Sequence, residues 1–530
     1  MSRTAATWPV GGASLDKESG WARFLAWANR PEGGLTLLVV TTLVARLLFA
    51  WALGLGVDES YMVATGRHLA LGYFDHPPAS WWMAWGAAHL FGSDAPVVVR
   101  LPFVLMFAGT TWLMFALTET LYGACAGLWA AAALNAAPVF GLTTGSWVLP
   151  DGPLVFFLLG GTLCLVRALR AERLGPASAA LAWWLGAGLC AGLALFSKYT
   201  AVLSLVGVFV YLLTERQARP ILARPGLWLA LALAALVFSP VVAWNAAHHW
   251  ASFAFQGGRA AGHKLHPFGP ITTLAGESLF LLPWVWLPLC GAGVFAWRWP
   301  EDAADRLLCW MALVPVLVFA LVSLRSKVLF HWAAPGYLML FPLLGRAVAR
   351  FRRQNGLVRF WLAANAAVVV LGAGLVATEV RFNWLPEIGE HFALGHDPDI
   401  QALDWTSVAR GLRAHGLLRG PDVVVAATRW LDAGKIDYAL GGKVPVICLG
   451  HDPREYGLLN ARRARNGATV VIVAPRTSLA HITRDYGGLF HRLVAVPPEM
   501  LTHSGQPAMQ VPVFIGYGLR WPQGGKATGS

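Results

Sequence analysis

Charged residues are scarce in this chain, and their scarcity argues against a soluble protein. Asp, Glu, Lys and Arg together make up 13% of the 530 residues, whereas 56% are hydrophobic and 26 residues are tryptophan. Soluble globular domains carry about 25% charged residues, and the mean hydropathy here is +0.54. The composition therefore predicts an α-helical protein that crosses a membrane many times.

Cysteine motifs and metal-ligand motifs are also missing. The six cysteines stand singly, five of them in apolar segments, and none has a CxxC or other metal-ligand spacing. The histidines do not form an HExxH pattern. We therefore expect no disulfide framework and no required cofactor, and a divalent metal is admissible but not indicated. The first thirty residues lack the regions of a signal peptide, so the first span is expected to act as the signal.

Long apolar runs are what the chain has instead. A membrane-spanning helix needs about 20 mainly apolar residues. About eleven such segments can be drawn, and they predict a transmembrane module over 35–380: 35–55, 97–118, 122–143, 151–169, 178–196, 199–213, 225–245, 273–297, 307–324, 329–348 and 360–380.

The positive residues predict the orientation of these spans. Arginine and lysine favour cytoplasmic loops, and they gather in the N-terminal tail, 1–34, and in alternate loops after it. The tail is therefore expected to be cytoplasmic, with the outer loop 56–96 and the C-terminal region outside, on the periplasmic face of a bacterial inner membrane. The net charge of +13 reflects this inner arginine belt, so we predict no nucleic-acid partner.

An acidic, histidine-containing segment follows the first apolar run. Asp58 and Glu59 come directly after it, where a carboxylate stays hydrated rather than inside the bilayer. Tyr73, Asp75 and His76 belong to the sequence GYFDHPP, in which two prolines favour a rigid extended corner. We expect these groups to meet in one cleft suited to general base chemistry and to holding a phosphate. The alternative is that they only cap and orient an interfacial loop.

Four more polar residues lie at the predicted outer ends of spans. Arg100 follows the apolar VVV of the second span and either reaches the lipid headgroups or faces the cleft. Asp151, between two prolines, is expected to begin a helix and to offer a second carboxylate. Lys198 and Tyr199, in FSKYT, are either interfacial anchors or ligands of a phosphate.

Two later outer segments carry cations. Residues 245–270 contain paired histidines, Gly257, Gly258 and Arg259, which suits a mobile lid whose basic groups meet an anion. Residues 323–335 contain Arg325, Lys327 and His331. These cations break the positive-inside pattern, so we interpret them as ligands of a bound anion, with snorkelling side chains as the alternative.

The motifs together resemble a known superfamily. They are an Asp-Glu after the first span, the GYFDHPP corner, the PDGP start of a later span, the SKYT junction and a K-x-x-x-H-W-x-x-P segment. In this order they are similar to the GT-C glycosyltransferases of the protein O-mannosyltransferase and aminoarabinose transferase superfamily, a bacterial glycosyltransferase family 39-like branch. The resemblance covers residues 35–350.

The resemblance implies a polyprenyl-phosphate-linked sugar donor used on the periplasmic side, with transfer to a hydroxyl of a lipid, glycan or protein. It assigns the catalytic carboxylate to Asp58, with Glu59 beside it. The corner residue that contacts the lipid phosphate is His76, where the aminoarabinose transferases typically have lysine. The basic-then-aromatic pattern falls on Lys327 and His331, the latter in place of a tyrosine.

The chemistry expected of such an enzyme suggests roles for the remaining residues. Asp58 would deprotonate the acceptor hydroxyl, and transfer would be a direct displacement with inversion at the sugar carbon. Cations would stabilise the departing phosphate. The predicted sets are: catalytic, Asp58 and Glu59; donor phosphate-binding, His76, Lys198, Arg325, Lys327 and His331; substrate-binding, Asp75, Tyr73, Asp151, Arg100 and Tyr199.

Two other functions stay open on the sequence. A transporter or flippase of a lipid-linked sugar would place charged groups in broken spans and inverted repeats, and no such repeat is evident. An O-antigen ligase or polymerase would use the same donors, but the Asp58 segment favours single-sugar transfer.

The chain changes character after residue 380. Short strand-like and helix-like segments alternate from Asp422 onward, which predicts a periplasmic α/β domain over 381–530 with a disordered tail, QGGKATGS. In its helix LDAGKIDYALG, a polar face of Lys435, Asp437 and Tyr438 is expected to be solvated or, alternatively, to touch an acceptor.

Overall fold

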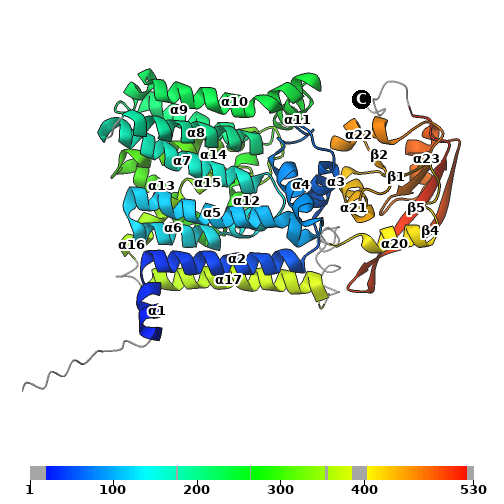
Figure 1. Cartoon of the computed structure of the whole chain (residues 1–530), viewed down its shortest axis with the longest axis horizontal. Helices are drawn as coiled ribbons and strands as arrows, with labels where there is room; N and C mark the ends of the chain where they lie inside the picture. Colours follow the sequence, from blue (N-terminus) through cyan, green and yellow to red (C-terminus); the bar gives the residue numbers. More distant parts are fainter. Residues whose placement is uncertain are drawn as a thin grey trace, which may run out of the picture.

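The computed structural model describes residues 20–521 apart from 175–176, 263, 352–355, 383 and 385–402. In this part of the chain, helices before residue 383 form a bundle, and a mixed sheet with helices follows at one end of it (Figure 1). The predicted disordered tail lies outside the described residues.

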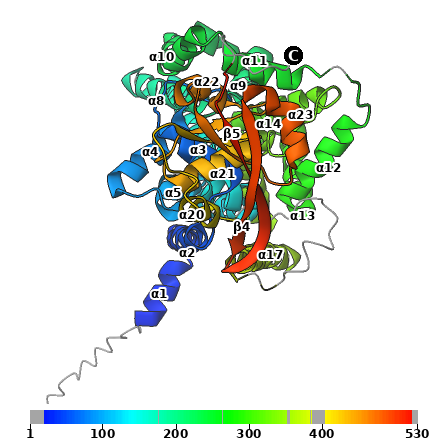
Figure 2. The same ribbon diagram turned by 90° about the vertical axis from the view of Figure 1, so that its right-hand side faces the viewer.

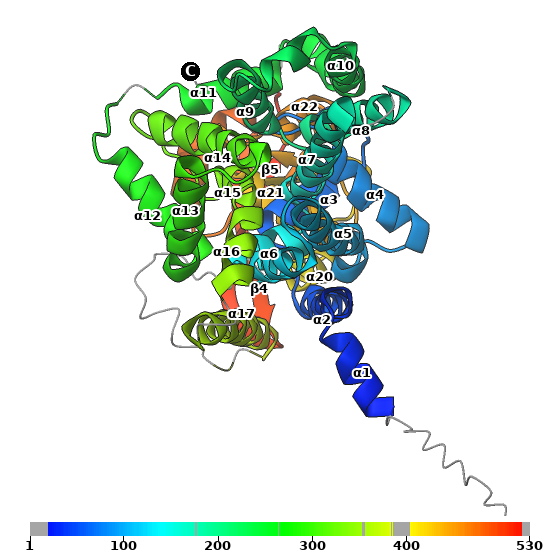
Figure 3. The ribbon, with the colours of Figure 1, turned by 90° about the vertical axis from the view of Figure 1, so that its left-hand side faces the viewer.

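Seven described helices are long and apolar enough to cross a membrane, or eight if a bent pair counts as one span. Viewed end-on, α2 and α17 lie together on one side of the bundle (Figure 3). The seven are α2 (Pro31–Ala52), α5 (Pro96–Tyr122), α7 (Asp151–Leu174), α8 (Ala177–Ser197), α10 (Pro225–Ala247), α14 (Ala303–Val322) and α17 (Gly356–Phe382).

The structure differs from the predicted eleven spans where the apolar runs are short or broken. Helices α6 (Ala124–Ala136) and α9 (Ala201–Thr214) are apolar but shorter than the length test requires. The run 273–297 consists of α12 (Gly269–Leu281) and α13 (Pro283–Arg298), bent by 109°. The bend falls at Leu282, which has a positive φ of 70° and precedes a proline that has no N–H to continue the helix. The run 329–348 contains the short α15 (Ala334–Leu338) and α16 (Phe341–Phe351).

Several short helices lie in the connections. They are α1 (Gly20–Ala28), α3 (Val57–Gly66), α4 (Ala79–Phe91), the π-helix η1 (Val139–Thr144), the 3₁₀ helix η2 (Arg219–Ala223) and α11 (Ala251–Ala260). Thus the predicted tail contains a helix, and the predicted lid 245–270 contains α11.

The sheet has the order β2-β1-β3-β5-β4. Strand β1 is parallel to β2 and β3, and β5 is antiparallel to β3 and β4. The strands are β1 (Val423–Ala427), β2 (Val446–Cys448), β3 (Thr469–Val473), β4 (Arg492–His503) and β5 (Gln506–Tyr517); the helices are α20 (Thr406–Ala414), α21 (Trp430–Leu440), α22 (Glu455–Arg463), α23 (Leu479–Tyr486) and the short η3 (Gly487–Leu489).

The alternating segments, which begin at Asp422, predicted these elements except α20, η3 and β4. That strand contains Pro497 and Pro498, and its pairing with β5 shifts register between Val496 and Glu499. Because proline cannot donate to a ladder, it is usually read against a strand, and β4 lies at the sheet edge where it is tolerated.

One face of the sheet shares its core with the first loop of the bundle. Val425 and Ala427 of β1 belong to the same buried cluster as Tyr61 and Trp81, whereas Val424 faces a separate cluster on the other side. Figure 2 shows the sheet and α21 in front of α3 at this end of the bundle. The C-terminal domain is therefore packed against the loop on which the candidate carboxylates lie.

Helix α21 makes this contact through residues predicted to be solvated. A Cβ on Gly434 would lie 2.8 Å from the Cα of Tyr61, so only glycine permits this approach of α21 to α3. Lys435 is 3% exposed and donates to the carbonyls of Leu55 (2.5 Å) and Leu403 (3.0 Å). Burial lowers the pKa of Lys435 to about 7. Its position corrects the prediction of a solvated or acceptor-binding face.

Asp437 and Tyr438 on the same helix are likewise internal. The Asp437 carboxylate accepts hydrogen bonds from Arg463 (2.8 Å), Tyr456 (3.1 Å) and Arg67 (3.4 Å). The Tyr438 hydroxyl donates to the carbonyl of Asp94 at 2.9 Å. These polar side chains hold the domain on the first loop instead of facing solvent.

Candidate active site

A polar cavity of about 400 Å³ lies where the bundle meets the C-terminal domain. Its walls come from the end of α2 and the start of α3, the corner after α3, η1 and the start of α7, α11, α12, the segment 329–332 and the residue before α22. Eight of the predicted site residues line it: Asp58, Glu59, Asp75, His76, Arg100, Asp151, Lys198 and His331.

Glu59 is clamped by four N–H donors. Arg100 donates through Nε (2.8 Å) and Nη2 (2.5 Å), and the backbone N–H groups of Gly56 (2.8 Å) and Val148 (2.9 Å) donate to the same carboxylate. Burial alone would raise the pKa of Glu59, but the charge and hydrogen bonds of Arg100 outweigh it and hold the pKa below its ordinary value. Glu59 therefore ties the start of α3 to α5 and to the segment between η1 and α7.

Arg100 has no donor left for a ligand. Its other hydrogen bonds go to the carbonyls of Ala50 (3.1 Å), Leu53 (2.8 Å) and Gly54 (2.7 Å). A guanidinium has five N–H donors, and here all five are used. Arg100 is 1% exposed, so it neither reaches the headgroups nor offers a substrate contact; this corrects its expected substrate-binding role.

Asp58 is in the opposite situation. It is exposed to the cavity, and its carboxylate accepts no hydrogen bond and forms no ion pair within the described part of the chain. The surrounding protein raises its pKa, through burial first and then through repulsion by Asp75 and Glu59, against the opposing charges of Arg454 and Arg259. An unpaired carboxylate with a raised pKa is suited to accepting a proton.

Asp75 connects the corner to the C-terminal domain. Its carboxylate accepts from the Tyr61 hydroxyl (3.1 Å) and from Arg454 Nη1 (3.2 Å), and its carbonyl accepts from Gln256 (2.5 Å). Burial raises the pKa of Asp75, while Arg454 opposes the shift. The corner is thus fixed between α3, α11 and the C-terminal domain.

Lys198, Asp151 and two histidines form the wall nearest the spans. Lys198 Nζ lies 2.8 Å from both oxygens of Asp151, which is the first residue of α7. His76 and His331 line the same wall, and His76 Nδ1 is buried without a hydrogen-bond partner in the described chain. Burial and the charge of Lys198 lower the pKa of both imidazoles, that of His331 to about 4. They are therefore neutral hydrogen-bonding groups near pH 7.

The π-helix η1 brings Thr143 and Thr144 to the cavity. A π-helix frees backbone carbonyls from ordinary helical bonding, and Arg46 of α2 takes one of them by donating to Gly141 O at 3.0 Å. It also donates to Asn135 at 2.8 Å. This buried arginine, which sequence analysis overlooked, braces the wall.

Four predicted site residues lie away from the cavity. The Tyr73 ring stacks on Trp81 with centroids 4.4 Å apart, and its hydroxyl donates to the His68 carbonyl at 3.2 Å. The Tyr199 hydroxyl lies 2.7 Å from Ser252 Oγ on α11. Arg325 and Lys327 are exposed and do not line the cavity.

These positions correct the expected roles of the four residues. The two tyrosines pack local structure, because their hydroxyls are used within the protein. Arg325 and Lys327 break the positive-inside pattern. Their side chains are exposed next to the site and do not contact the cavity.

Two arginines complete the cavity, and only one was anticipated. Arg259, expected in a lid, lies on α11, and Arg454, which was missed, is contributed by the C-terminal domain. The sequence signal for Arg454 is faint: it stands in DPREYG, where a proline and a glycine surround two charges. Among the described residues, no group of three or more His, Cys, Asp or Glu side chains is arranged to hold a metal ion.

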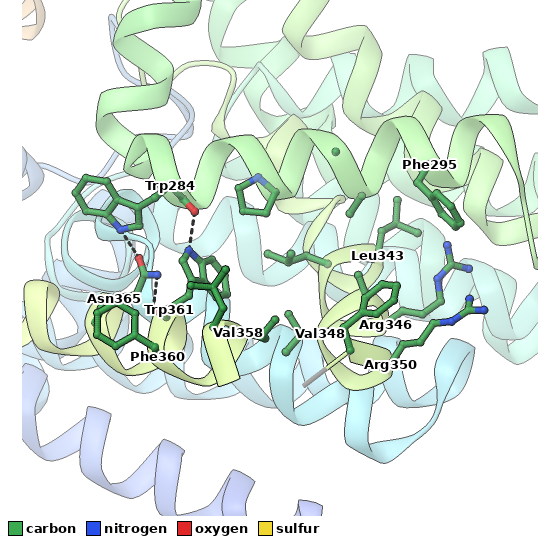
Figure 4. A pocket seen from close by; sticks show the side chains of 18 of the residues that line it. Trp284, Phe295, Leu343, Arg346, Val348, Arg350, Val358, Phe360, Trp361 and Asn365 are labelled. Carbon is green, nitrogen blue, oxygen red and sulfur yellow. Dashed lines mark hydrogen bonds between the residues drawn. The ribbon is translucent and has the colours of Figure 1, made fainter. Parts of the chain in front are cut away.

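A larger cavity of about 880 Å³ lies elsewhere and has mostly apolar walls. Figure 4 shows its lining from α13, α16 and α17, including Trp284, Phe295 and Phe360. The two arginines at its edge are paired, Arg346 with Asp305 (2.9 Å) and Arg350 with Glu301 (3.2 Å). The described residues that line it include no unpaired carboxylate and no nucleophile, so the smaller polar cavity is the candidate active site.

Acidification is expected to destabilise the protein through His331. The unfolded imidazole takes up a proton near pH 6.5, but the folded one does so only near pH 4. The unfolded state therefore binds more protons between these values, and stability falls as the pH drops from about 6.5 to about 4. Thermal unfolding of the wild type and of His331→Gln across this range measures the effect. The variant should lose less stability, and equal losses would contradict the prediction.

The sequence is similar to known proteins. A family model described as dolichyl-phosphate-mannose-protein mannosyltransferase matches residues 75–244. A curated relative, the lipid A galacturonosyltransferase RgtD of Rhizobium johnstonii, is 25% identical over 321 residues, covering 58% of this chain; the match spans 63% of that relative's length.

Solved structures share the fold. ArnT from Cupriavidus metallidurans, in a crystal structure with bound undecaprenyl phosphate, is 15% identical, with a TM-score of 0.64 over 91% of this chain and 98% of that one. Its apo structure gives a TM-score of 0.60 at the same identity and coverage. The resemblance of this multi-span membrane protein to the GT-C glycosyltransferases is therefore confirmed, in sequence over residues 75–244 and in fold over most of the chain.

Proposed function

We propose that the chain is a membrane glycosyltransferase that moves a sugar from a polyprenyl-phosphate donor to a hydroxyl of a lipid, glycan or protein. The observation that carries this proposal is the unpaired Asp58 carboxylate, facing a cavity that also holds cations and hydrogen-bond donors. The relative named as a lipid A enzyme and the ArnT structure with a bound lipid phosphate support this donor class and favour a glycolipid acceptor.

The reaction follows from the positions of these groups. The acceptor oxygen forms a bond to the anomeric carbon while the bond from that carbon to the phosphate oxygen breaks. The acceptor proton passes to Asp58, and polyprenyl phosphate leaves with the bonding electrons. Attack from the face opposite the phosphate inverts the configuration at the anomeric carbon.

The phosphate would lie at the wall nearest the spans. Lys198 directly follows α8 and Asp151 begins α7, so both stand at helix ends where a lipid carrier's phosphate would emerge. Lys198 and the N–H groups of His76 and His331 would donate to it, while Asp151 holds Lys198 in position.

We place the cavity and the C-terminal domain on the periplasmic side of the bacterial inner membrane. The support is the distribution of arginine and lysine, which gather in the tail and in alternate loops on the other side.

Mass spectrometry of lipids and surface glycans tests the function. Cells without the chain, and cells that carry Asp58→Asn, should both lose one sugar-sized mass from the acceptor and accumulate the polyprenyl-phosphate sugar. Loss of the same mass with the lipid-linked sugar retained on the cytoplasmic side would instead indicate a flippase. The bent pair α12 and α13 holds a buried carboxylate, Glu277, which accepts from Tyr337 at 2.7 Å. A charged group in a broken span is expected of a transporter, so the experiment must separate transfer from flipping.

Donor affinity should depend on Lys198 and not on Lys327. Because Lys198→Met alone leaves Asp151 unpaired, the variant to use is Lys198→Met with Asp151→Asn, which removes both charges. We expect its KM for a polyprenyl-phosphate sugar to rise at least about 10-fold, since a charge-assisted hydrogen bond is lost. Lys327→Met is the matched control and should leave KM unchanged. An unchanged KM in the double variant would remove Lys198 from the phosphate site.

A further inference from the structure

A second polar cavity, of about 620 Å³, lies where the C-terminal domain meets the end of α3. It is formed at the start of β1, just before β2 and β3, and at the end of α22. The described residues that line it include none that line the candidate active site. Asp58 lies in the first turn of α3 and Arg67 follows its last residue, so the two are about 14 Å apart along the helix axis.

This second cavity is strongly cationic. Two carboxylates line it, Asp422 and Asp437, and one of them is already used: Asp437 accepts from Arg463 at 2.8 Å and from Arg67 at 3.4 Å. Like charges gathered in one concave site attract anions. The cationic side chains that line the cavity are Arg67, Lys443, Arg462, Arg463 and Arg465.

Three of these cations are free to meet a ligand. The side chains of Lys443, Arg462 and Arg465 are exposed, and they form no hydrogen bond or ion pair with any residue that the structure describes. Arginine presents a planar fork of N–H donors that matches a phosphate. The cavity therefore offers unpaired donors beside two arginines that Asp437 holds in place.

The backbone holds the cations close together. Gly441 and Gly442 follow α21 with φ of 69° and 70°, which favours glycine, and a Cβ on Gly442 would lie 3.1 Å from Arg67 Cδ. This turn brings Lys443 beside Arg67. Burial, together with the charges of Arg463, Arg462 and Arg67 and against that of Asp437, lowers the pKa of the neighbouring His68. Its imidazole is therefore a neutral hydrogen-bonding group near pH 7.

The cavity lies at the end of a candidate span. Arg67 pairs with Asp94 at 2.8 Å, and Asp94 is two residues before Pro96, the first residue of α5. The Tyr438 hydroxyl donates to the carbonyl of the same residue. Lipid headgroups lie at the ends of membrane-spanning helices, so the nearest anions of high local concentration would be lipid phosphates.

Exposed apolar side chains adjoin the cavity. Leu69 and Leu71 follow His68 directly and are exposed, and Leu90 and Phe91 at the end of α4 are 78% and 56% exposed. Trp82 of α4 joins the two segments by donating to the Ala70 carbonyl at 2.8 Å. Figures 2 and 3 both show α4 at the edge of the bundle. Apolar and aromatic side chains at this depth are typical of a helix that lies in the membrane interface.

We propose that this cavity binds the phosphate of a membrane lipid headgroup, while the acyl chains of that lipid lie against α4 and the segment 69–71. The cations match the phosphate, and the adjoining apolar side chains favour a lipid over a soluble anion. This lipid site is separate from the wall proposed for the donor phosphate and does not depend on sugar transfer. The bound lipid would hold α3 and the C-terminal domain at the membrane edge.

Lipid binding to the purified full chain in a neutral detergent, measured by native mass spectrometry, tests this inference. The probes are dioleoyl phosphatidic acid and dioleoylglycerol, which differ only by the phosphate. Each cation near a lipid phosphate contributes about fivefold in affinity. The wild type should therefore prefer phosphatidic acid about 100-fold, and Arg462→Gln with Arg465→Gln should reduce this preference about 25-fold.

Two further variants keep the test decisive. Arg410→Gln with Arg492→Gln makes the same charge change at exposed positions of the C-terminal domain outside the cavity, and it should leave the preference unchanged. Lys443→Gln should reduce the preference about fivefold and replaces the double variant if that protein fails to fold.

Three results would overturn the lipid site. The first is a wild type that binds both lipids equally. The second is a cavity variant that keeps the full preference, which would place the phosphatidic acid elsewhere on the chain. The third is inorganic phosphate that displaces phosphatidic acid at equal concentration, which would assign the cavity to a soluble anion.

Discussion

Replacing Asp58 with asparagine is expected to slow sugar transfer by about 10²- to 10⁴-fold, the usual contribution of a general base. The amide has nearly the shape of the carboxylate but cannot take the acceptor proton. Because Asp58 pairs with no described side chain, the fold should be unaffected. Donor affinity should be retained or rise slightly, since one negative charge leaves the phosphate's surroundings.

The measurement is the transfer rate in proteoliposomes, together with thermal unfolding of the same samples. Asp94→Asn is the matched control, because this carboxylate is 44% exposed, pairs with Arg67 and lies outside the cavity. A folded Asp58→Asn protein whose rate stays within tenfold of the wild type would show that another group accepts the proton.

Replacing the neighbouring Glu59 with alanine is expected to destabilise the protein instead. The change leaves Arg100 buried without its counter-ion and leaves the N–H groups of Gly56 and Val148 without an acceptor. Removing one partner of a buried ion pair costs about 3–5 kcal/mol, a large part of typical folding stability. Any activity lost should follow the loss of folded protein.

Thermal unfolding of Glu59→Ala and Asp58→Asn in the same detergent compares the two carboxylates directly. The expected result is a large fall in unfolding temperature for the first and almost none for the second. A stable Glu59→Ala protein with abolished turnover would assign Glu59 to the chemistry, as the sequence first suggested.

The sequence could predict the carboxylates and histidines of the candidate site but not which role each of them has. Asp58 is conspicuous because it directly follows an apolar run, and Asp75 and His76 because they stand in the proline-containing corner GYFDHPP. Adjacent residues on a helix point about 100° apart, and the Asp-Glu pair alone does not say which faces the cavity. That depends on Arg100, whose position after a valine run also suits a snorkelling side chain.

The residues that were missed come from contacts across long sequence distances. Arg454 lies 379 residues beyond its partner Asp75, and no local periodicity reports such a pairing. The same applies to Lys435, which bonds the Leu55 carbonyl 380 residues away. A helix read alone has a polar face, but only the packing of α21 on α3 shows that this face is internal.

The apolar runs predicted the long helices well and their breaks poorly. Composition identified the run 273–297, but a proline after a leucine of positive φ divides it into two helices at 109°. Proline is common within the other spans, as at Pro102, Pro240 and Pro315. Its presence in the sequence therefore did not distinguish a bend of this size from a continuous helix.

The close contact of Gly434 with Tyr61 limits how this protein can be rebuilt or can diversify. A domain grafted from a related enzyme would need a glycine at that point and a cation able to reach the Leu55 carbonyl, or the loop carrying Asp58 would shift. Exchange of whole C-terminal modules should therefore fail more often than point changes around Arg454. New sugar preferences would be reached by altering side chains on a retained scaffold, and chimeras would best be cut within the bundle, so that α3 and α21 come from one parent.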